Sequence, residues 1–171
     1  RFRRLLPAAW AVLALVVGAG VLGRWDEAQL RHLRGDVPSA LLQVVNWHFV
    51  AGDRSYGDAF TAPSPLEHYW SLAIEQQFYL VLPLLVLLVV RRAPRQLPAR
   101  LRVGILAAVL ALLAASSLVL NGVLARGSID RAYFGSDTRA AELLLGGLLA
   151  CATLRRVQLP SPRARTLASV A

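Results

Sequence analysis

The sequence contains no lysine and no methionine, and Cys151 is its only cysteine. A single cysteine excludes an internal disulfide, and its place in an apolar stretch favours a packing role over nucleophilic chemistry. The sequence also lacks metal-ligand spacings, phosphate-binding glycine loops, internal repeats and low-complexity tracts. We therefore expect no metal site and no bound cofactor.

Because lysine is absent, all 19 basic residues are arginines, set against 10 acidic residues, and the formal net charge is +9. Twelve arginines form three clusters without any acidic residue: Arg1, Arg3 and Arg4; Arg91, Arg92, Arg95, Arg100 and Arg102; Arg155, Arg156, Arg163 and Arg165. Such an excess can indicate nucleic-acid binding, but cytoplasmic loops of membrane proteins show it too. We interpret it as a topology signal and expect no nucleic-acid partner. The clusters can also contact anionic lipid or the phosphates of a cytoplasmic acyl donor.

Hydrophobic residues make up 56% of the 171 residues and are gathered in blocks. A membrane-spanning helix needs roughly 20 apolar residues. Four blocks reach or approach that length: residues 5–23, 66–90, 101–120 and 140–154, the last only if residues 136–139 enter the membrane with it. Four crossings would put all three arginine clusters on one side. We predict an all-α fold, a polytopic transmembrane helical bundle forming a single membrane domain over residues 1–171.

The segments between these blocks are assigned from their composition. Residues 24–38 and the loops 51–65 and 121–135 are predicted on the outer side, with residues 91–102 as the inner loop. Residues 40–50 are apolar but too short to cross, which favours a re-entrant or interfacial helix beginning near Pro38. Pro83 is expected to kink the second span. The basic, apolar N-terminal segment could instead be a secretory signal.

Polar groups follow one face of the second span. From His68, this face takes in Ser71, Glu75 and Tyr79, because residues three, four and seven apart lie together on a helix. A histidine can act as a general base near neutral pH, and a carboxylate can hold its tautomer. The same groups could simply cap the helix and bond to neighbouring helices. Glu75 lies deepest of the charged groups, where an unpaired carboxylate is costly, which favours a functional role.

A second polar group opens the fourth block. Arg139 and Glu142 are three residues apart and can pair, with Asp137 just before them. This pair could bind an anionic or sugar ligand, or it could be a structural ion pair between helices. Gly146 and Gly147 permit close helix contact. Trp70 could pack, sit at the membrane interface or form a substrate platform.

One long motif resembles the signature of the acyltransferase 3 family, which comprises bacterial integral-membrane O-acyltransferases related to O-antigen acetylases. The string is Ser64-Pro65-Leu66-x-His68-x-Trp70-Ser71-Leu72-x-x-Glu75-x-Gln77-Phe78-Tyr79. Three further stretches agree with it in order along the chain: residues 1–7, Asn46-Trp47, and Asp137-Thr138-Arg139-Ala140-x-Glu142-Leu143-Leu144-x-Gly146.

The resemblance implies transfer of an acyl group, usually acetyl from acetyl-CoA, to a hydroxyl of an extracytoplasmic carbohydrate. It implies a multi-pass protein of the bacterial inner or plasma membrane, with membrane lipid, acyl-CoA and a carbohydrate acceptor as partners. We predict His68, Ser71 and Glu75 as catalytic residues. The predicted substrate-binding residues are Arg139, Glu142, Asp137, Trp70, Tyr79 and Asn46.

Other functions stay open at this point. The family's first helix, whose paired Arg and His are implicated in transfer, has no counterpart in these residues, so we expect a fragment whose own activity is undecided. A membrane transporter or a lipid-linked glycan flippase would also need a charged cavity between helices. An inactive remnant of a broken gene is the third possibility.

Overall fold

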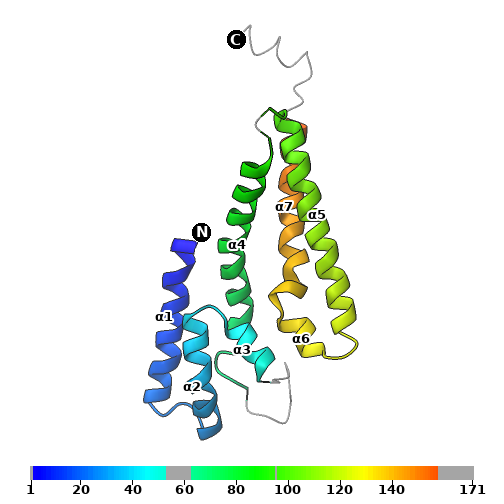
Figure 1. The fold of residues 1–171 in the computed structure, drawn as a ribbon. Coiled ribbons are helices and arrows are strands. Elements are labelled where there is room, and N and C mark those ends of the chain that lie inside the picture. Colours follow the sequence, from blue (N-terminus) through cyan, green and yellow to red (C-terminus); the bar gives the residue numbers. More distant parts are fainter. Residues whose placement is uncertain (1, 53–62, 95, 158–171) are drawn as a thin grey trace.

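The computed structural model describes residues 2–52, 63–94 and 96–157, and every regular element in these ranges is a helix. The prediction of an all-α fold is confirmed. The helices are α1 (Phe2–Val21), α2 (Glu27–Leu41), α3 (Val45–Ala51), α4 (Tyr69–Arg92), α5 (Ala99–Leu124), α6 (Ile129–Phe134) and α7 (Ser136–Val157), arranged as in Figure 1.

Two helices are long and apolar enough to cross a membrane, namely α4 and α5. In each, only 17% of the most apolar 18-residue window is buried inside the structure. Many of their leucines and valines therefore face outward, as expected for helices that contact lipid or further helices. The apolar part of α1, Leu5–Val21, is shorter. α7 begins with Ser136 and carries charged residues in its first turns. The predicted total of four spanning helices stays a prediction.

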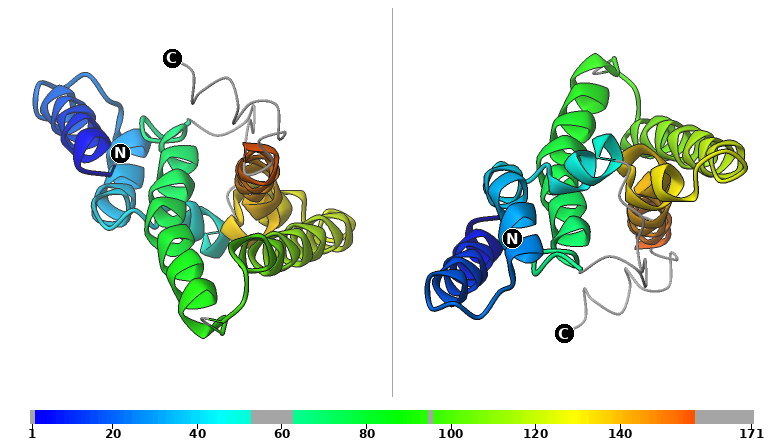
Figure 2. Two further views of the ribbon diagram at one scale, coloured as in Figure 1. Left: turned by 90° about the horizontal axis from the view of Figure 1, so that it is seen from above. Right: turned by 90° about the horizontal axis from the view of Figure 1, so that it is seen from below.

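The helices α5 and α7 lie side by side in all three views (Figures 1 and 2). Their contact is formed by Leu110 and Ala114 of α5 against Ala141, Leu144 and Cys151 of α7. Gly147 allows the close approach, because a Cβ there would lie 3.2 Å from Leu110 Cδ1. The buried Cys151 thus has the packing role expected of it. Helix α4 joins this core through Phe78, Leu82 and Leu85.

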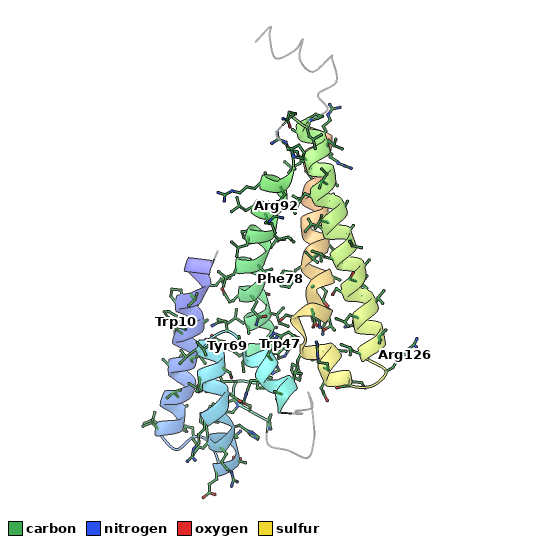
Figure 3. All side chains as sticks on the ribbon, viewed as in Figure 1. Trp10, Trp47, Tyr69, Phe78, Arg92 and Arg126 are labelled. Atoms are coloured by element: carbon green, nitrogen blue, oxygen red, sulfur yellow. The ribbon has the colours of Figure 1, made fainter. Side chains whose placement is uncertain are left out.

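A second apolar core lies where α1, α2 and α3 meet the first turns of α4. Its buried members include Leu13 of α1, Leu33 of α2, Phe49 of α3 and Ala73 of α4, and Phe134 of α6 completes it. Figure 3 shows Trp47 and Tyr69 in this region, far from Arg92 at the other end of α4. The start of α4 is therefore the most enclosed part of that helix.

Two segments that were predicted on the outer side, without an assigned helix, contain helices. Helix α2 begins after Asp26, whose carboxylate accepts a hydrogen bond from Gln29 N while the Gln29 side chain accepts one from Asp26 N. This capping box satisfies backbone donors that otherwise disfavour a helix start. Pro38 lies inside the last turn of α2, so the prediction that it begins the next helix was wrong. The short helix predicted over residues 40–50 is α3.

The other unexpected helix is α6, within the predicted loop 121–135. Ser128 caps it by accepting a hydrogen bond from Arg131 N at 3.2 Å, and Gly135 ends it. Helix α5 also extends four residues beyond its predicted end, to Leu124. The predicted outer loop 51–65 falls mostly on residues 53–62, which lie outside the described residues. Helix α4 continues through Pro83 to Arg92.

Candidate functional site

A small pocket of about 120 Å³ opens between the first turns of α4 and α7. Its lining residues are Trp70, Ser71, Ile74 and Glu75 of α4, and Arg139, Glu142 and Leu143 of α7. Residues three or four apart share a helix face, so each helix presents one such face to the pocket. The structure therefore brings together the predicted site residues Trp70, Ser71, Glu75, Arg139 and Glu142, which come from two distant parts of the sequence.

The guanidinium of Arg139 is held from several directions. Nε donates to the Tyr133 carbonyl oxygen at 3.2 Å, and Nη1 donates to Glu142 Oε1 at 2.5 Å. Its Cζ lies 4.8 Å from the ring centroid of Tyr133 and 5.6 Å from that of Trp70. Charge-assisted hydrogen bonds and cation–π contacts both favour one position of the cation. The pocket thus has a fixed positive charge in its wall.

The carboxylate of Glu75 is placed differently from that of Glu142. Glu142 pairs with Arg139, whereas Glu75 makes no hydrogen bond or ion pair with any residue that the structure describes. Its side chain is exposed at the pocket. A carboxylate without an internal partner can accept a hydrogen bond from a ligand hydroxyl. Glu75 is therefore the pocket group best placed to meet an acceptor.

Trp70 forms an aromatic wall behind this pocket. Its ring lies 4.7 Å from the ring of Tyr133 and 5.6 Å from that of Phe134, centroid to centroid. Tilted and edge-to-face pairs at these distances are favourable. These ring contacts link the first turn of α4 to α6. Tyr133, one of the residues in the wall, also supplies the backbone carbonyl that accepts the hydrogen bond from Arg139.

Two members of the predicted polar ladder, His68 and Tyr79, do not line the pocket. Helix α4 begins at Tyr69, one residue after His68, whose side chain is exposed and makes no capping bond. Ser71 Oγ donates to the His68 backbone carbonyl at 3.4 Å, so the hydroxyl meets the backbone of His68. Tyr79 lies one turn beyond Glu75 and is half-buried. The ladder is thus divided, and the roles of its members stay predictions.

Asp137 also points away from the pocket. Its carboxylate accepts two hydrogen bonds from Arg131, at 2.9 Å from Nη1 and 2.7 Å from Nη2. These bonds hold the pKa of Asp137 below its ordinary value and raise the pKa of Arg131. The Arg131 Cζ lies 4.9 Å from the ring centroid of Trp47. This ion pair joins α6 to the start of α7, so its contacts in this structure are those of a structural ion pair between helices.

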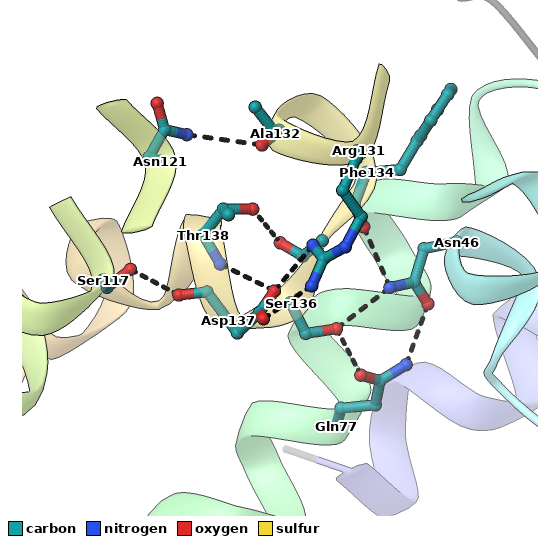
Figure 4. A network of polar contacts seen from close by, with 11 residues as sticks. Asn46, Gln77, Ser117, Asn121, Arg131, Ala132, Phe134, Ser136, Asp137 and Thr138 are labelled. Atoms are coloured by element: carbon teal, nitrogen blue, oxygen red, sulfur yellow. Dashed lines mark hydrogen bonds and ion pairs between the residues drawn. The ribbon is translucent and has the colours of Figure 1, made fainter. Parts of the chain in front are cut away.

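Asn46 lies fully buried in a network that joins α3, α4 and the start of α7 (Figure 4). Its Nδ2 donates to the Phe134 carbonyl at 3.0 Å and to Ser136 Oγ at 2.9 Å, and its Oδ1 accepts from Gln77 Nε2 at 2.9 Å. Both polar atoms of this side chain thus have partners within the protein. Its predicted substrate-binding role is not tested by this geometry, which places Asn46 outside the pocket lining.

A separate buried carboxylate, Asp36 of α2, ties down the segment that leads into α4. Asp36 Oδ1 lies 3.2 Å from His48 Nε2, and Ser64 Oγ donates to Asp36 Oδ2. Gly35 makes room for His48, because a Cβ there would lie 2.8 Å from Nε2. Burial of a carboxylate is favourable only with such partners. Asp36 therefore joins α2 to α3 and to the segment that precedes α4.

No group of three His, Cys, Asp or Glu side chains within the described residues is close enough to hold a metal ion. Sequence reasoning missed Arg131, Gln77 and Ser136 as organisers of the site. Gln77 was part of the motif string, which pointed to its importance but not to its partners. Arg131 lies in the predicted loop 121–135, where Ser128 is a local signal of α6, and Ser136 lies where the fourth apolar block was expected to begin.

Comparison with known proteins assigns the family. The family profile described as "Acyltransferase domain" matches residues 1–171. The chain belongs to this acyltransferase family, as the resemblance had indicated.

Two relatives illustrate the likeness. The chain is 44% identical over 152 residues to "Putative peptidoglycan O-acetyltransferase YrhL" of Bacillus subtilis (strain 168), and the match covers 88% of this chain and 23% of that protein. It is 40% identical over 152 residues to peptidoglycan O-acetyltransferase OatA of Listeria monocytogenes, with the same two coverages of 88% and 23%. The chain thus spans less than a quarter of the length of these relatives. No solved structure matches the chain.

Proposed function

We propose that this chain forms part of a membrane-bound O-acyltransferase, which moves an acyl group, most simply acetyl, to a hydroxyl of an extracytoplasmic carbohydrate. The observation that carries the proposal is the pocket in which Ser71 and Glu75 of α4 face Arg139 and Glu142 of α7. Family membership and the names of the relatives, which include peptidoglycan O-acetyltransferases, support it. By analogy with those names, the acceptor is a cell-wall glycan.

The pocket groups suit acyl transfer to a hydroxyl. In that reaction the acceptor oxygen bonds to the acyl carbonyl carbon, the donor's bond to that carbon breaks, and the acceptor proton leaves. Glu75 would accept the hydrogen bond of the acceptor hydroxyl and orient it or pass on its proton. The fixed guanidinium of Arg139 would stabilise negative charge developing on the carbonyl oxygen. Trp70 would offer an apolar face to a sugar ring.

We further propose that the protein is a multi-pass protein of the bacterial inner or plasma membrane, with α1, α4, α5 and the apolar stretch 140–154 of α7 as its spans. The arginine-rich loop between α4 and α5 would be cytoplasmic. The pocket lies at the start of α4, whereas Arg91 and Arg92 lie at its end. The pocket would therefore open toward the outer side, where a cell-wall acceptor is found.

We propose acyl-CoA as the donor, because the arginines of the inner loop could meet its phosphates. The assay is transfer of labelled acetyl from acetyl-CoA to glycan by the protein, produced from its natural reading frame in membrane vesicles. An ester on the glycan with release of free CoA supports this donor. If an ester forms from another activated acyl compound but not from acetyl-CoA, the proposed donor is wrong and the proposed acyltransferase activity still holds. Glycan movement without ester formation would favour a flippase.

The central test replaces Glu75 by glutamine in the protein made from its natural reading frame. We expect Glu75→Gln to lower acyl transfer by about 10²–10⁴-fold, the usual range for loss of a group that handles the proton. The amount of the variant protein in the membrane should not change, because Glu75 makes no hydrogen bond or ion pair with any described residue. Glu27→Gln is the matched control, since Glu27 is an exposed carboxylate on α2 away from the pocket. A Glu75→Gln protein that keeps most of its activity would refute this assignment.

A further inference from the structure

The two helices that build the pocket are not closely packed along their length. A second, apolar cavity of about 280 Å³ lies between α4, α5 and α7 beside their apolar contacts, and its lining includes Phe78 and Leu82 of α4 and Leu144 of α7. Apolar contacts around a cavity resist sliding and rotation less than a close-packed interface does. The separation of Glu75 from Arg139 therefore needs another constraint.

The constraint is a closed ring of hydrogen bonds among Gln77, Asn46 and Ser136 (Figure 4). Gln77 Nε2 donates to Asn46 Oδ1 at 2.9 Å, Asn46 Nδ2 donates to Ser136 Oγ at 2.9 Å, and Ser136 Oγ donates to Gln77 Oε1 at 2.5 Å. Each residue donates to the next, so the bonds polarise one another in the same sense. Both amide orientations are fixed by this order of donors and acceptors.

The ring is anchored to the backbone on two sides. Gln77 Nε2 also donates to the Gln43 carbonyl at 2.7 Å, and Asn46 Nδ2 to the Phe134 carbonyl at 3.0 Å. Both amide groups thus use their two donor hydrogens and one acceptor oxygen. Removing one member would leave the others with unsatisfied polar groups in a largely buried place, which costs more than the bond itself contributes.

The placement of the ring ties it to the pocket. Gln77 follows Glu75 by two residues, so the two side chains leave α4 about 200° apart, at about 100° per residue. The ring therefore holds α4 from the side opposite Glu75 and fixes its rotation. Ser136 is the first residue of α7 and precedes Arg139 by three residues, within the same turn. One hydrogen bond, Ser136 to Gln77, thus joins the two pocket-forming segments directly.

From these contacts we infer that Gln77 is a positioning residue for acyl transfer, which sets Glu75 of α4 against Arg139 of α7. The inference rests on the proposed function for its consequence in the reaction, but the helix placement itself can be measured without any assay of activity. A misplacement of about 1 Å can lower the rate of an enzyme about 10²-fold.

The neighbouring residue supplies a matched control. Gln76 is fully buried, and neither its Nε2 nor its Oε1 has a hydrogen-bond partner among the described residues. Gln76→Leu and Gln77→Leu are therefore the same chemical change at adjacent positions. Gln77 is half-buried and belongs to the hydrogen-bond ring, whereas Gln76 is buried and does not belong to it. We expect Gln77→Leu to lower kcat about 10–100-fold with a smaller change in KM, and Gln76→Leu to leave both near the wild-type values.

Helix placement is measured by the distance between spin labels. The labels are attached at Leu80→Cys on α4 and Leu145→Cys on α7, both exposed positions, with Cys151→Ala removing the one cysteine of residues 1–171. We expect Gln77→Leu to shift or broaden this distance distribution, and Gln76→Leu to leave it unchanged. An unchanged distribution in Gln77→Leu overturns the inference, as does a changed distribution with unaltered kcat.

A double-mutant cycle between Gln77→Leu and Ser136→Ala completes the test. Because the two side chains share one hydrogen bond, the double variant should lose little more kcat than Gln77→Leu alone, whereas independent residues would lose the product of both effects. Additive losses would speak against the ring. If the wild-type protein transfers no acyl group, the proposed function fails, and the spin-label distances still decide whether Gln77 fixes α4 against α7.

Discussion

Two charged side chains of the pocket differ in how much freedom the fold leaves them. Arg139 makes hydrogen bonds to Tyr133 and Glu142 and lies beside the rings of Trp70 and Tyr133, so its charge has one position. Glu75 has no internal partner among the described residues and faces the pocket. Electrostatic stabilisation is strongest when the stabilising group is fixed before the reaction. Arg139 suits that task, and Glu75 suits contact with a ligand.

The fixed position of Arg139 predicts that lysine cannot replace it. A lysine ammonium cannot reproduce two separately directed guanidinium hydrogen bonds together with stacking on Trp70 and Tyr133. We expect Arg139→Lys to lower kcat by about 10²–10³-fold, as for loss of one preorganised charge-stabilising donor. Arg126→Lys is the control, because Arg126 is exposed beyond the end of α5. Wild-type kinetics in Arg139→Lys would show that only the charge of residue 139 matters, or that it takes no part.

At the residue scale, the sequence predicted the residues that line the pocket better than the residues that hold its helices in place. The spacing of Ser71 and Glu75, and of Arg139 and Glu142, is local and follows from helix geometry. The exclusion of His68 depends on α4 starting at Tyr69, and helix starts are poorly defined by pattern alone. Gln77 and Ser136 are 59 residues apart, so no local rule could have paired them.

Among the elements, the corner between α6 and α7 determines how the pocket wall is held. Arg131 of α6 pairs with Asp137 of α7, and Ser117 of α5 donates to the Asp137 carbonyl at 2.6 Å and accepts from Ala141 N at 3.1 Å. Both sets of bonds support the first two turns of α7. Tyr133 and Arg139 lie on either side of this corner, so the corner also aligns the carbonyl with the guanidinium.

The Arg131–Asp137 pair predicts a specific pH dependence. The folded-state pKa of Asp137 is lowered, so the stabilisation is fully present above the unfolded pKa, roughly 4, and is lost as the pH falls through the folded value. Both side chains are partly exposed, which limits the effect to about 0.2–1 kcal/mol.

The measurement is thermal unfolding in detergent as a function of pH. Asp137→Asn and Arg131→Gln should each have a lower Tm than the wild type at pH 7, and the differences should shrink once the pH falls below about 4. Both variants should show this pH dependence, because each removes the ion pair, whereas only Arg131→Gln also removes the contact with the Trp47 ring. A Tm difference that is unchanged down to pH 2 would show that the pair contributes nothing through its charge.

The elements themselves were predicted where the apolar signal was long. Helices α4 and α5 follow from long blocks that are mainly apolar and reach the length needed to cross a membrane. Helices α2 and α6 were missed because both are polar segments between such blocks. Their caps, Asp26 with Gln29 and Ser128, were readable but were outweighed by the surrounding charged and glycine residues.

For the whole molecule, the charged residues differ between the two ends of α4, α5 and α7. The loop from Arg91 to Arg102 joins α4 to α5 and contains no acid, and Arg155 of α7 reaches the same end, where it lies against Gly104 of α5. The opposite end of α5 leads to α6, whose residues carry both signs. Arginine is costly to move across a membrane, so loops rich in it are retained in the cytoplasm. The pocket lies at the mixed-charge end.

This division predicts which residues a membrane-impermeant thiol reagent can reach. In a Cys151→Ala protein, single cysteines would be placed at Leu22, Gln96 and Ile129, which are all exposed. If α1, α4, α5 and α7 all cross the membrane, Leu22→Cys and Ile129→Cys lie outside and react in intact cells, whereas Gln96→Cys reacts only after the cells are opened. Labelling of Gln96→Cys in intact cells would show that the orientation is the reverse of the one proposed. If Leu22→Cys is protected while Ile129→Cys is labelled, α1 does not cross the membrane. In that case α4 and α5 alone would cross and place the pocket on the outer side.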